Sequence, residues 1–159
     1  MPHFSFLNDS SGIPEIFAHD RALYGSIGKL REKIMRGPSP LSAADRELIA
    51  AFVSRLNECT LCADRHEALA GELGSDVTVL QSLVASVDEA PISDRLKPIF
   101  RFVKKLTEQP ARIVQADAEA VFAAGWNEKA LEHAIAVCAF FSMVNRLADG
   151  YGLKGGDGQ

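Results

Sequence analysis

The sequence lacks any long hydrophobic run, any excess of basic residues and any signal-peptide pattern. Its 17 Lys and Arg are outnumbered by 21 Asp and Glu, and a net charge of −4 argues against a surface for nucleic acid or anionic membranes. No run approaches the roughly 18 consecutive apolar residues of a membrane span. The start, MPHFSFLNDSSGIPEIF, has neither a basic region nor an apolar stretch, so we expect a cytoplasmic protein that binds neither membrane nor nucleic acid.

Cysteine is also scarce, with three residues in the whole chain. A chain of 159 residues that is 47% hydrophobic and 24% charged can form one globular domain without disulfides or a metal. In a cytoplasmic protein, a Cys-x-x-Cys pair is therefore more typical of catalysis or metal binding than of a structural disulfide.

No stretch alternates between polar and apolar residues, so the sequence predicts no strands. Apolar residues at helical spacing and the Gly, Pro, Ser, Asp and Asn residues between them predict an all-α fold with helices over residues 16–34, 43–56, 60–73, 77–87, 94–106, 117–124 and 128–147. We divide the chain into an irregular N-terminal arm (1–12), a single helical domain (13–153) and a flexible tail (154–159).

The residues best suited to chemistry are concentrated in NECTLCADRH, at positions 57–66. Positions four apart lie on the same face of a helix, so Cys62 and His66 can contact each other. If a helix begins near Thr60, Cys59 is its N-cap and Cys62 lies in its first turn. Unpaired backbone N–H groups stabilise a thiolate there, and we therefore predict a pKa of Cys62 below the roughly 8.5 of free cysteine.

A carboxylate close to His66 would orient the imidazole ring. Glu67 is adjacent in sequence but points about 100° away around the helix. Glu47 is a better candidate, although in one unbroken helix it would lie roughly 22 Å from Cys62. The apolar pattern fails at 57–58, and a reversal there would bring Glu47 back. We therefore predict two helices folded against each other, with Glu47 facing Cys62 and His66.

Three interpretations of this set of residues remain open. Cys59 and Cys62 can be a redox pair, because a second thiol resolves the oxidised sulfur of the first. With His66 and a distant carboxylate or histidine they can be four zinc ligands, although the second ligand pair of typical zinc sites is missing. They can also be structural residues of the core.

Other polar or reactive residues are assigned structural roles. Cys138 lies within the apolar segment AIAVCAFF and is predicted to be a buried, inert thiol. Asn145, Arg146 and Asp149 form a polar set in an apolar helix, to which we assign a structural role: Arg146 and Asp149 either pair with each other or bond a neighbouring helix or subunit. His133 is expected to line a helix interface.

Together these positions read E-x11-C-x2-C-x3-H, a pattern that resembles the alkylhydroperoxidase D-like branch of the carboxymuconolactone decarboxylase family. The segments GPSPLSAADRELIAAFVSRLNECTLCADRH and FFSMVNRLADGYGL look like the branch often called peroxidase-related proteins. The resemblance covers roughly residues 13–153.

This resemblance implies a compact helical domain that assembles into homotrimers or homohexamers. It further implies a thiol peroxidase of the peroxiredoxin type that needs no cofactor and no metal. Cys62 would attack the hydroperoxide and become a sulfenic acid, Cys59 would condense with it, and His66 and Glu47 would relay the proton. The expected partners are a small hydroperoxide and an external dithiol, such as a lipoyl group on another protein.

One position departs from the family pattern. The alkylhydroperoxidase D proteins carry a histidine directly before the second cysteine, where this sequence has Leu61. The decarboxylase members generally lack the cysteine pair, so that activity is not expected here. The alternative that stays open is a non-catalytic metal-binding or structural oligomer of the same fold.

Overall fold

The computed structural model describes residues 1–76 and 78–154, and in this part of the chain helices are the only regular secondary structure. The all-α prediction is therefore confirmed. In chain order the helices are α1 (Ile13–His19), α2 (Arg21–Tyr24), α3 (Ile27–Arg36), α4 (Ala43–Leu56), α5 (Thr60–Glu72), α6 (Val79–Ala85), α7 (Lys97–Glu108), the 3-10 helix η1 (Pro110–Arg112), α8 (Gln115–Ala123) and α9 (Glu128–Gly150).

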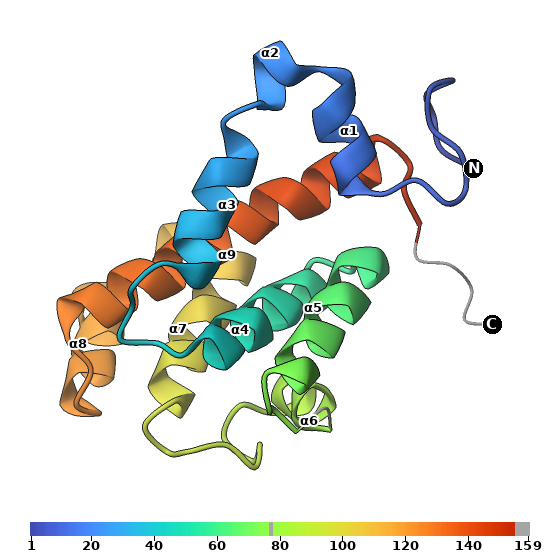
Figure 1. Ribbon diagram of the computed structural model, residues 1–159. Coiled ribbons are helices and arrows are strands. Elements are labelled where there is room, and N and C mark those ends of the chain that lie inside the picture. The colour runs from blue at the N-terminus through green and yellow to red at the C-terminus, as the bar shows by residue number, and fades with distance from the viewer. Residues whose placement is uncertain (77, 155–159) are drawn as a thin grey trace.

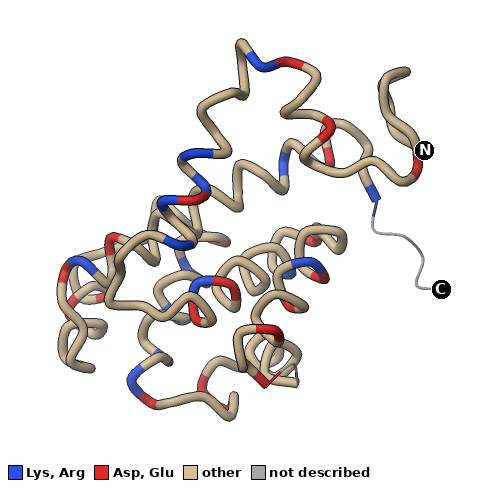
Figure 2. Tube along the Cα trace, in the orientation of Figure 1, with Lys and Arg blue, Asp and Glu red and all other residues tan. Residues whose placement is uncertain are grey.

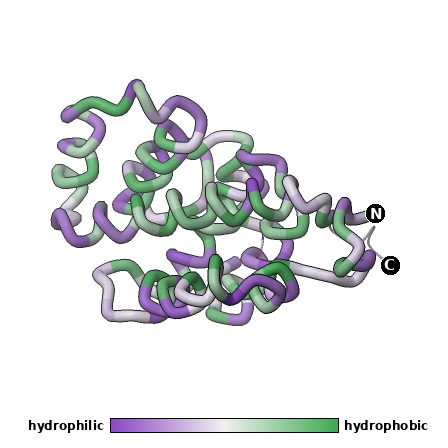
Figure 3. The backbone as a smooth tube through the Cα atoms, turned by 90° about the horizontal axis from the view of Figure 1, so that it is seen from above, coloured by the Kyte–Doolittle hydropathy of each residue, from purple (hydrophilic) through white to green (hydrophobic). Residues whose placement is uncertain are grey.

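Helices α4 and α9 form the centre of the fold (Figure 1). Helix α4 packs against α5, α6, α7 and α9, and the long α9 also contacts α1, α3, α7 and α8. Phe52 of α4 and Phe100 of α7 are fully buried and meet edge to face at a centroid distance of 5.4 Å. Hydrophobic segments recur along the central helices (Figure 3), because these helices bury most of the apolar side chains.

The start of α4 follows directly from its sequence. The Ser42 hydroxyl accepts a hydrogen bond from the Asp45 N–H at 3.0 Å, and the Asp45 carboxylate accepts one from the Ser42 N–H at 3.2 Å. This reciprocal capping box satisfies two backbone donors that a helix start leaves free. The capping box therefore fixes where α4 begins, ahead of the residues that this helix contributes to the site.

The chain reverses direction after α4, as the break in the apolar pattern predicts. Asn57 is the C-cap, and Glu58 has a positive φ of 61°, in the left-handed region. The Cys59 N–H then donates to the Ser54 carbonyl at 2.9 Å, which closes the turn. Helix α5 begins at Thr60 and folds back along α4.

The prediction of one helix over residues 16–34 is wrong. The segment is divided into α1, α2 and α3, because the Asp20 carboxylate accepts the Leu23 N–H at 2.9 Å and starts a new short helix. An aspartate that bonds to its own backbone competes with helix continuation. Leu23, which counted toward a buried stripe, is 65% exposed.

Two further helix starts lie later in the chain than predicted. Asp76 accepts the N–H of Thr78 in a turn, so α6 begins only at Val79. Ser93 likewise belongs to a turn that precedes α7, which begins at Lys97. In both places the polar side chain stabilises a local turn before the helix instead of capping it.

Helix α9 begins as predicted, because the Asn127 side chain accepts the Ala130 N–H at 2.9 Å. Within the described residues it is the one helix long and apolar enough to cross a membrane by length and composition. Half of its apolar window is buried inside the fold, against the other helices. Its apolarity is thereby explained by its position in the core.

The two ends of the described chain lie together at one side of the molecule (Figure 1). The His3 N–H donates to the Tyr151 carbonyl at 3.0 Å, and the two hydroxyls of Tyr24 and Tyr151 are 3.2 Å apart. Gly152 has a φ of +73°, and a side chain there would meet the His3 ring at 2.9 Å. Of the predicted tail, residues 155–159 lie outside the described residues.

Candidate functional site

The two cysteines of the Cys-x-x-Cys motif meet at the start of α5. Cys59 is the N-cap residue and Cys62 lies in the first turn, where the sequence places them. Both are free thiols, and their Sγ atoms are 2.7 Å apart. Their exposed fractions are 2% and 5%, so the two sulfurs are close neighbours in a largely dry environment.

The histidine and the carboxylate are also brought together. His66 Nδ1 lies 2.5 Å from the Glu47 Oε2 atom, and the two residues are 6% and 0% exposed. An ionised carboxylate can only accept, so the imidazole donates through Nδ1. In the neutral ring this leaves Nε2 as the proton acceptor. The ring is held in place by Phe141, which it contacts edge to face at 4.3 Å between centroids.

Glu47 has a second partner that sequence reasoning missed. Arg36, at the end of α3, donates to the Glu47 Oε1 atom at 2.5 Å. Burial by itself raises the pKa of Glu47, but the hydrogen bonds and positive charges of His66 and Arg36 outweigh it and hold that pKa below its ordinary value. No local sequence signal marks Arg36, because the contact depends on how α3 packs on α4.

The acidity of the two thiols differs from the prediction. The pKa of Cys59 is lowered, chiefly by its hydrogen bond with the Cys62 thiol, whose sulfur lies 2.7 Å away. The pKa of Cys62 is raised, chiefly by the same hydrogen bond and then by burial. The expected low pKa of Cys62 is therefore wrong: of the two coupled thiols, Cys59 has the lowered pKa and Cys62 the raised one.

A buried polar network lies behind the thiols. The Asn145 amide donates to the Ser54 hydroxyl at 3.0 Å and accepts from the Asn57 amide at 3.0 Å. Its side chain is 0% exposed, and its N–H groups also lower the pKa of Cys59 and of Cys62. Asn145 thus connects α9 to the turn that carries the cysteines.

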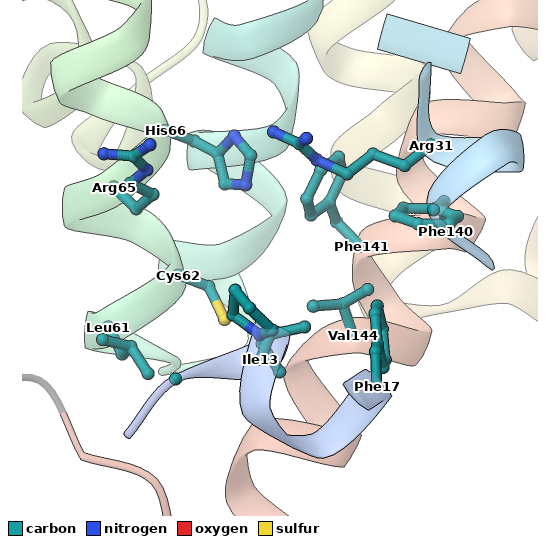
Figure 4. Close-up of a pocket in the computed structure, with 13 residues that line it drawn as sticks. Ile13, Phe17, Arg31, Leu61, Cys62, Arg65, His66, Phe140, Phe141 and Val144 are labelled. Carbon is teal, nitrogen blue, oxygen red and sulfur yellow. The ribbon is translucent and has the colours of Figure 1, made fainter. Parts of the chain in front are cut away.

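A cavity of about 430 Å³ opens onto this site (Figure 4). It lies between α1, α3, α5 and α9, and both Cys62 and His66 face it. The remaining lining residues are mainly apolar: Gly12, Ile13, Pro14, Phe17, Gly28, Arg31, Leu61, Arg65, Phe140, Phe141 and Val144. Cys59 is absent from the lining, so the two sulfurs differ in access as well as in acidity.

The other candidates stay outside this arrangement. Cys138 is 1% exposed, and its sulfur lies 3.3 Å from the Thr107 hydroxyl, as expected of an inert core thiol. Arg146 donates to the Ser142 carbonyl, and an Arg146–Asp149 ion pair is absent from the described residues. Across residues 1–76 and 78–154, no three His, Cys, Asp or Glu side chains converge as a metal site would require.

Fold and site together define a class of protein: an all-helical domain with two vicinal thiols at a helix start and a buried carboxylate–histidine pair beside them. The chain belongs to the carboxymuconolactone decarboxylase family, whose model matches residues 21–105. That match includes the reversal between α4 and α5 and all four predicted site residues.

Solved structures support the same fold. An uncharacterized peroxidase-related protein from Silicibacter sp. TM1040 is 29% identical, with a TM-score of 0.80 over 87% of this chain and 73% of the other. The alkylhydroperoxidase AhpD core protein from Ralstonia eutropha JMP134 is 23% identical, with a TM-score of 0.81 over 89% and 75%. A protein of unknown function from Agrobacterium tumefaciens is 18% identical, with a TM-score of 0.69 over 86% and 92%. No functionally curated protein matches the chain significantly.

Proposed function

We propose that the protein is a thiol-dependent hydroperoxidase that uses Cys59 and Cys62 with a proton relay of His66 and Glu47. The observation that carries the proposal is the pair of free thiols, 2.7 Å apart, of which one faces a cavity beside a histidine oriented by a buried carboxylate. Similarity to a peroxidase-related protein supports the same chemistry. The site residues require no cofactor for it.

Cys62 is the thiol that meets the hydroperoxide, because it lines the cavity and Cys59 does not. Its proton passes to the Cys59 sulfur or to the His66 imidazole, and the Cys62 thiolate attacks the terminal oxygen of the hydroperoxide. The O–O bond breaks, the sulfur keeps one oxygen as a sulfenic acid, and the leaving alkoxide takes the proton to become an alcohol. The sulfur is oxidised by two electrons and the peroxide is reduced by two.

Cys59 completes the cycle, since its lowered pKa makes it the thiolate of the pair. It attacks the sulfur of the Cys62 sulfenic acid, the S–O bond breaks, and the departing oxygen takes a proton from the His66 relay and leaves as water while the disulfide forms. An external dithiol then restores both thiols by exchange and is itself oxidised to a disulfide. A lipoyl-type dithiol on a partner protein remains our proposal for this reductant, together with a cytoplasmic location and a homo-oligomeric assembly.

The second candidate is a structural oligomer of the same fold that has lost peroxidase activity. Leu61 supports it, because it lines the cavity at the position where the family pattern has a further histidine. The carboxylate–histidine pair does not depend on that position and is intact. We therefore favour the catalytic assignment.

The deciding experiment measures the consumption of cumene hydroperoxide with dithiothreitol as the reductant. Cys62→Ser is expected to abolish it. Reduced Cys59→Ser, assayed without dithiothreitol, is expected to consume one equivalent of hydroperoxide and to keep a sulfenic acid on Cys62 that dimedone traps. Cys138→Ala is the matched control and is expected to keep the parent rate, because that thiol is buried in the core away from the cavity. Equal consumption by Cys62→Ser and the parent would refute the proposal.

A further inference from the structure

The cavity beside the thiols contains an unusual combination of apolar walls and positive charge. Its aromatic and aliphatic surface comes from α1, α5 and α9, and its two charged lining residues besides His66 are Arg31 of α3 and Arg65 of α5. No aspartate or glutamate lines it. Figure 4 shows both guanidinium groups beside the cavity, on the same side as His66.

Neither arginine side chain has a polar partner in the described part of the protein. Within the described residues, the side chains of Arg31 and Arg65 make no ion pair and no hydrogen bond. By contrast, Arg36 pairs with Glu47, and Arg55 pairs with two carboxylates on α5. Two guanidinium groups thus remain available to a molecule inside the cavity.

The surroundings of the two guanidinium groups strengthen the positive electrostatic field in the cavity. Glu47, the nearest buried carboxylate of the site, is already ion-paired with Arg36 and hydrogen-bonded to His66. The protein as a whole carries a net charge of −4, and charges of both signs are interspersed along its helices (Figure 2). The cavity is therefore locally positive in an acidic protein. An apolar wall makes such charges act more strongly than they do in open water.

We propose that this cavity selects hydroperoxides that carry a carboxylate on an apolar body. The apolar body packs against Phe17, Phe140 and Val144, while Arg31 and Arg65 bind the carboxylate through charge-assisted hydrogen bonds. This orientation directs the O–O group toward Cys62. The inference rests on the proposed peroxidase function and specifies its substrate class. The carboxylate takes no part in the redox step, which proceeds at Cys62 and Cys59 as described above.

The test compares three substrates that share the cumene hydroperoxide skeleton: cumene hydroperoxide itself, its para-carboxylate and the methyl ester of that carboxylate. In the parent, kcat/KM for the carboxylate is expected to exceed that for the ester about tenfold, since the arginines are partly solvated. In the double variant Arg31→Ala/Arg65→Ala this ratio is expected to fall to about one. Arg112→Ala, an arginine outside the cavity, is the matched control and is expected to keep the parent ratio.

A binding measurement separates this inference from the peroxidase proposal. Calorimetry of 4-isopropylbenzoate and its methyl ester needs no turnover, and the parent is expected to bind the anion about tenfold more tightly, with the preference lost in the double variant. If that preference holds but no hydroperoxide is reduced, the anion site stands and the peroxidase proposal fails. If neutral hydroperoxides are reduced but neither assay shows a preference for the anion, the inference is wrong and the peroxidase proposal stands.

Discussion

At the scale of single residues, the site depends on how each charge is balanced. Glu47 is fully buried, yet it stays ionised because His66 and Arg36 both donate to it. The same pairing fixes the imidazole so that Nε2 is its acceptor. Cys59 and Cys62 differ in acidity, because a hydrogen bond joins their sulfurs: the pKa of Cys59 is lowered and that of Cys62 is raised. They also differ in their access to the cavity.

Glu47→Gln tests the relay at this scale. The amide keeps the shape but lacks the carboxylate that accepts from Nδ1 and leaves Nε2 as the proton acceptor, so thiol oxidation by cumene hydroperoxide is expected to slow by about tenfold or more. Stopped-flow fluorescence of the reduced protein measures that rate, and circular dichroism checks the fold. Glu67→Gln is the control, because Glu67 pairs with Arg55 at 3.1 Å outside the site. An unchanged rate in Glu47→Gln would remove Glu47 from the mechanism.

The acid stability of the protein should also depend on Glu47. Its folded-state pKa lies below the ordinary value of 4.5, so its ionised form contributes stability that is fully present above about pH 4.5. This contribution is lost as the pH falls through the folded-state pKa. The free energy of unfolding of the parent relative to Glu47→Gln should therefore decrease on acidification below pH 4.5, measured by urea denaturation across the acid range. A difference that stays constant with pH would show that Glu47 is not held ionised.

At the scale of secondary-structure elements, the decisive feature is the turn between α4 and α5. Glu58 has the left-handed conformation there, which a residue with a side chain adopts at a penalty. The turn places Cys59 at the start of α5 and returns α5 along α4. Glu47 and His66, which are 19 positions apart in the chain, thereby come into contact.

Glu58→Gly is expected to stabilise the protein by about 0.5–1 kcal/mol, because glycine adopts a positive φ without the steric penalty. The Glu58 side chain is exposed, so little else is lost. Lys29→Gly, at an exposed position inside α3, should instead destabilise the protein by about 1 kcal/mol. Chemical denaturation measures both values. Equal destabilisation by the two variants would contradict the role given to Glu58.

At the scale of the whole molecule, the site is assembled from five helices: α1, α3, α4, α5 and α9. Helix α9 packs against α4 and carries Asn145 to the turn between α4 and α5. Helices α1 and α3 complete the cavity that the cysteine-bearing helix alone does not enclose. Stability and thiol chemistry should consequently be linked through α9.

Asn145→Ala tests this link. It removes one buried and one partly buried hydrogen bond and leaves Ser54 and Asn57 without their partner, so a loss of about 2 kcal/mol is expected. The pKa of Cys59 should rise in the same variant, because Asn145 lowers it in the parent. Urea denaturation and the ultraviolet absorbance of the thiolate measure the two effects. Arg146→Ala, at the exposed neighbouring position, should change neither, and a variant Asn145→Ala with parent-like values in both assays would refute the link.

The sequence by itself determined the features that depend on local rules. Ser42 and Asn127 cap the helices that they were predicted to cap, the chain breaks at 57–58, and Cys59 and Cys62 lie at a helix start. Capping, helical periodicity and turn preferences act over a few residues and can be read directly. The spacing of Glu47 from the cysteines further suggested the fold family to which the chain belongs.

Only the tertiary structure decided what depends on packing between distant segments. It divided residues 16–34 into three helices, brought Arg36 to Glu47, and turned Asn145 toward the thiols. It also reversed the expected acidity of Cys62, because that pKa is set by the position of the neighbouring sulfur and by burial as well as by the helix start. Hydrogen bonds, burial and charge between elements act through space, and their partners cannot be read from adjacent letters of the chain.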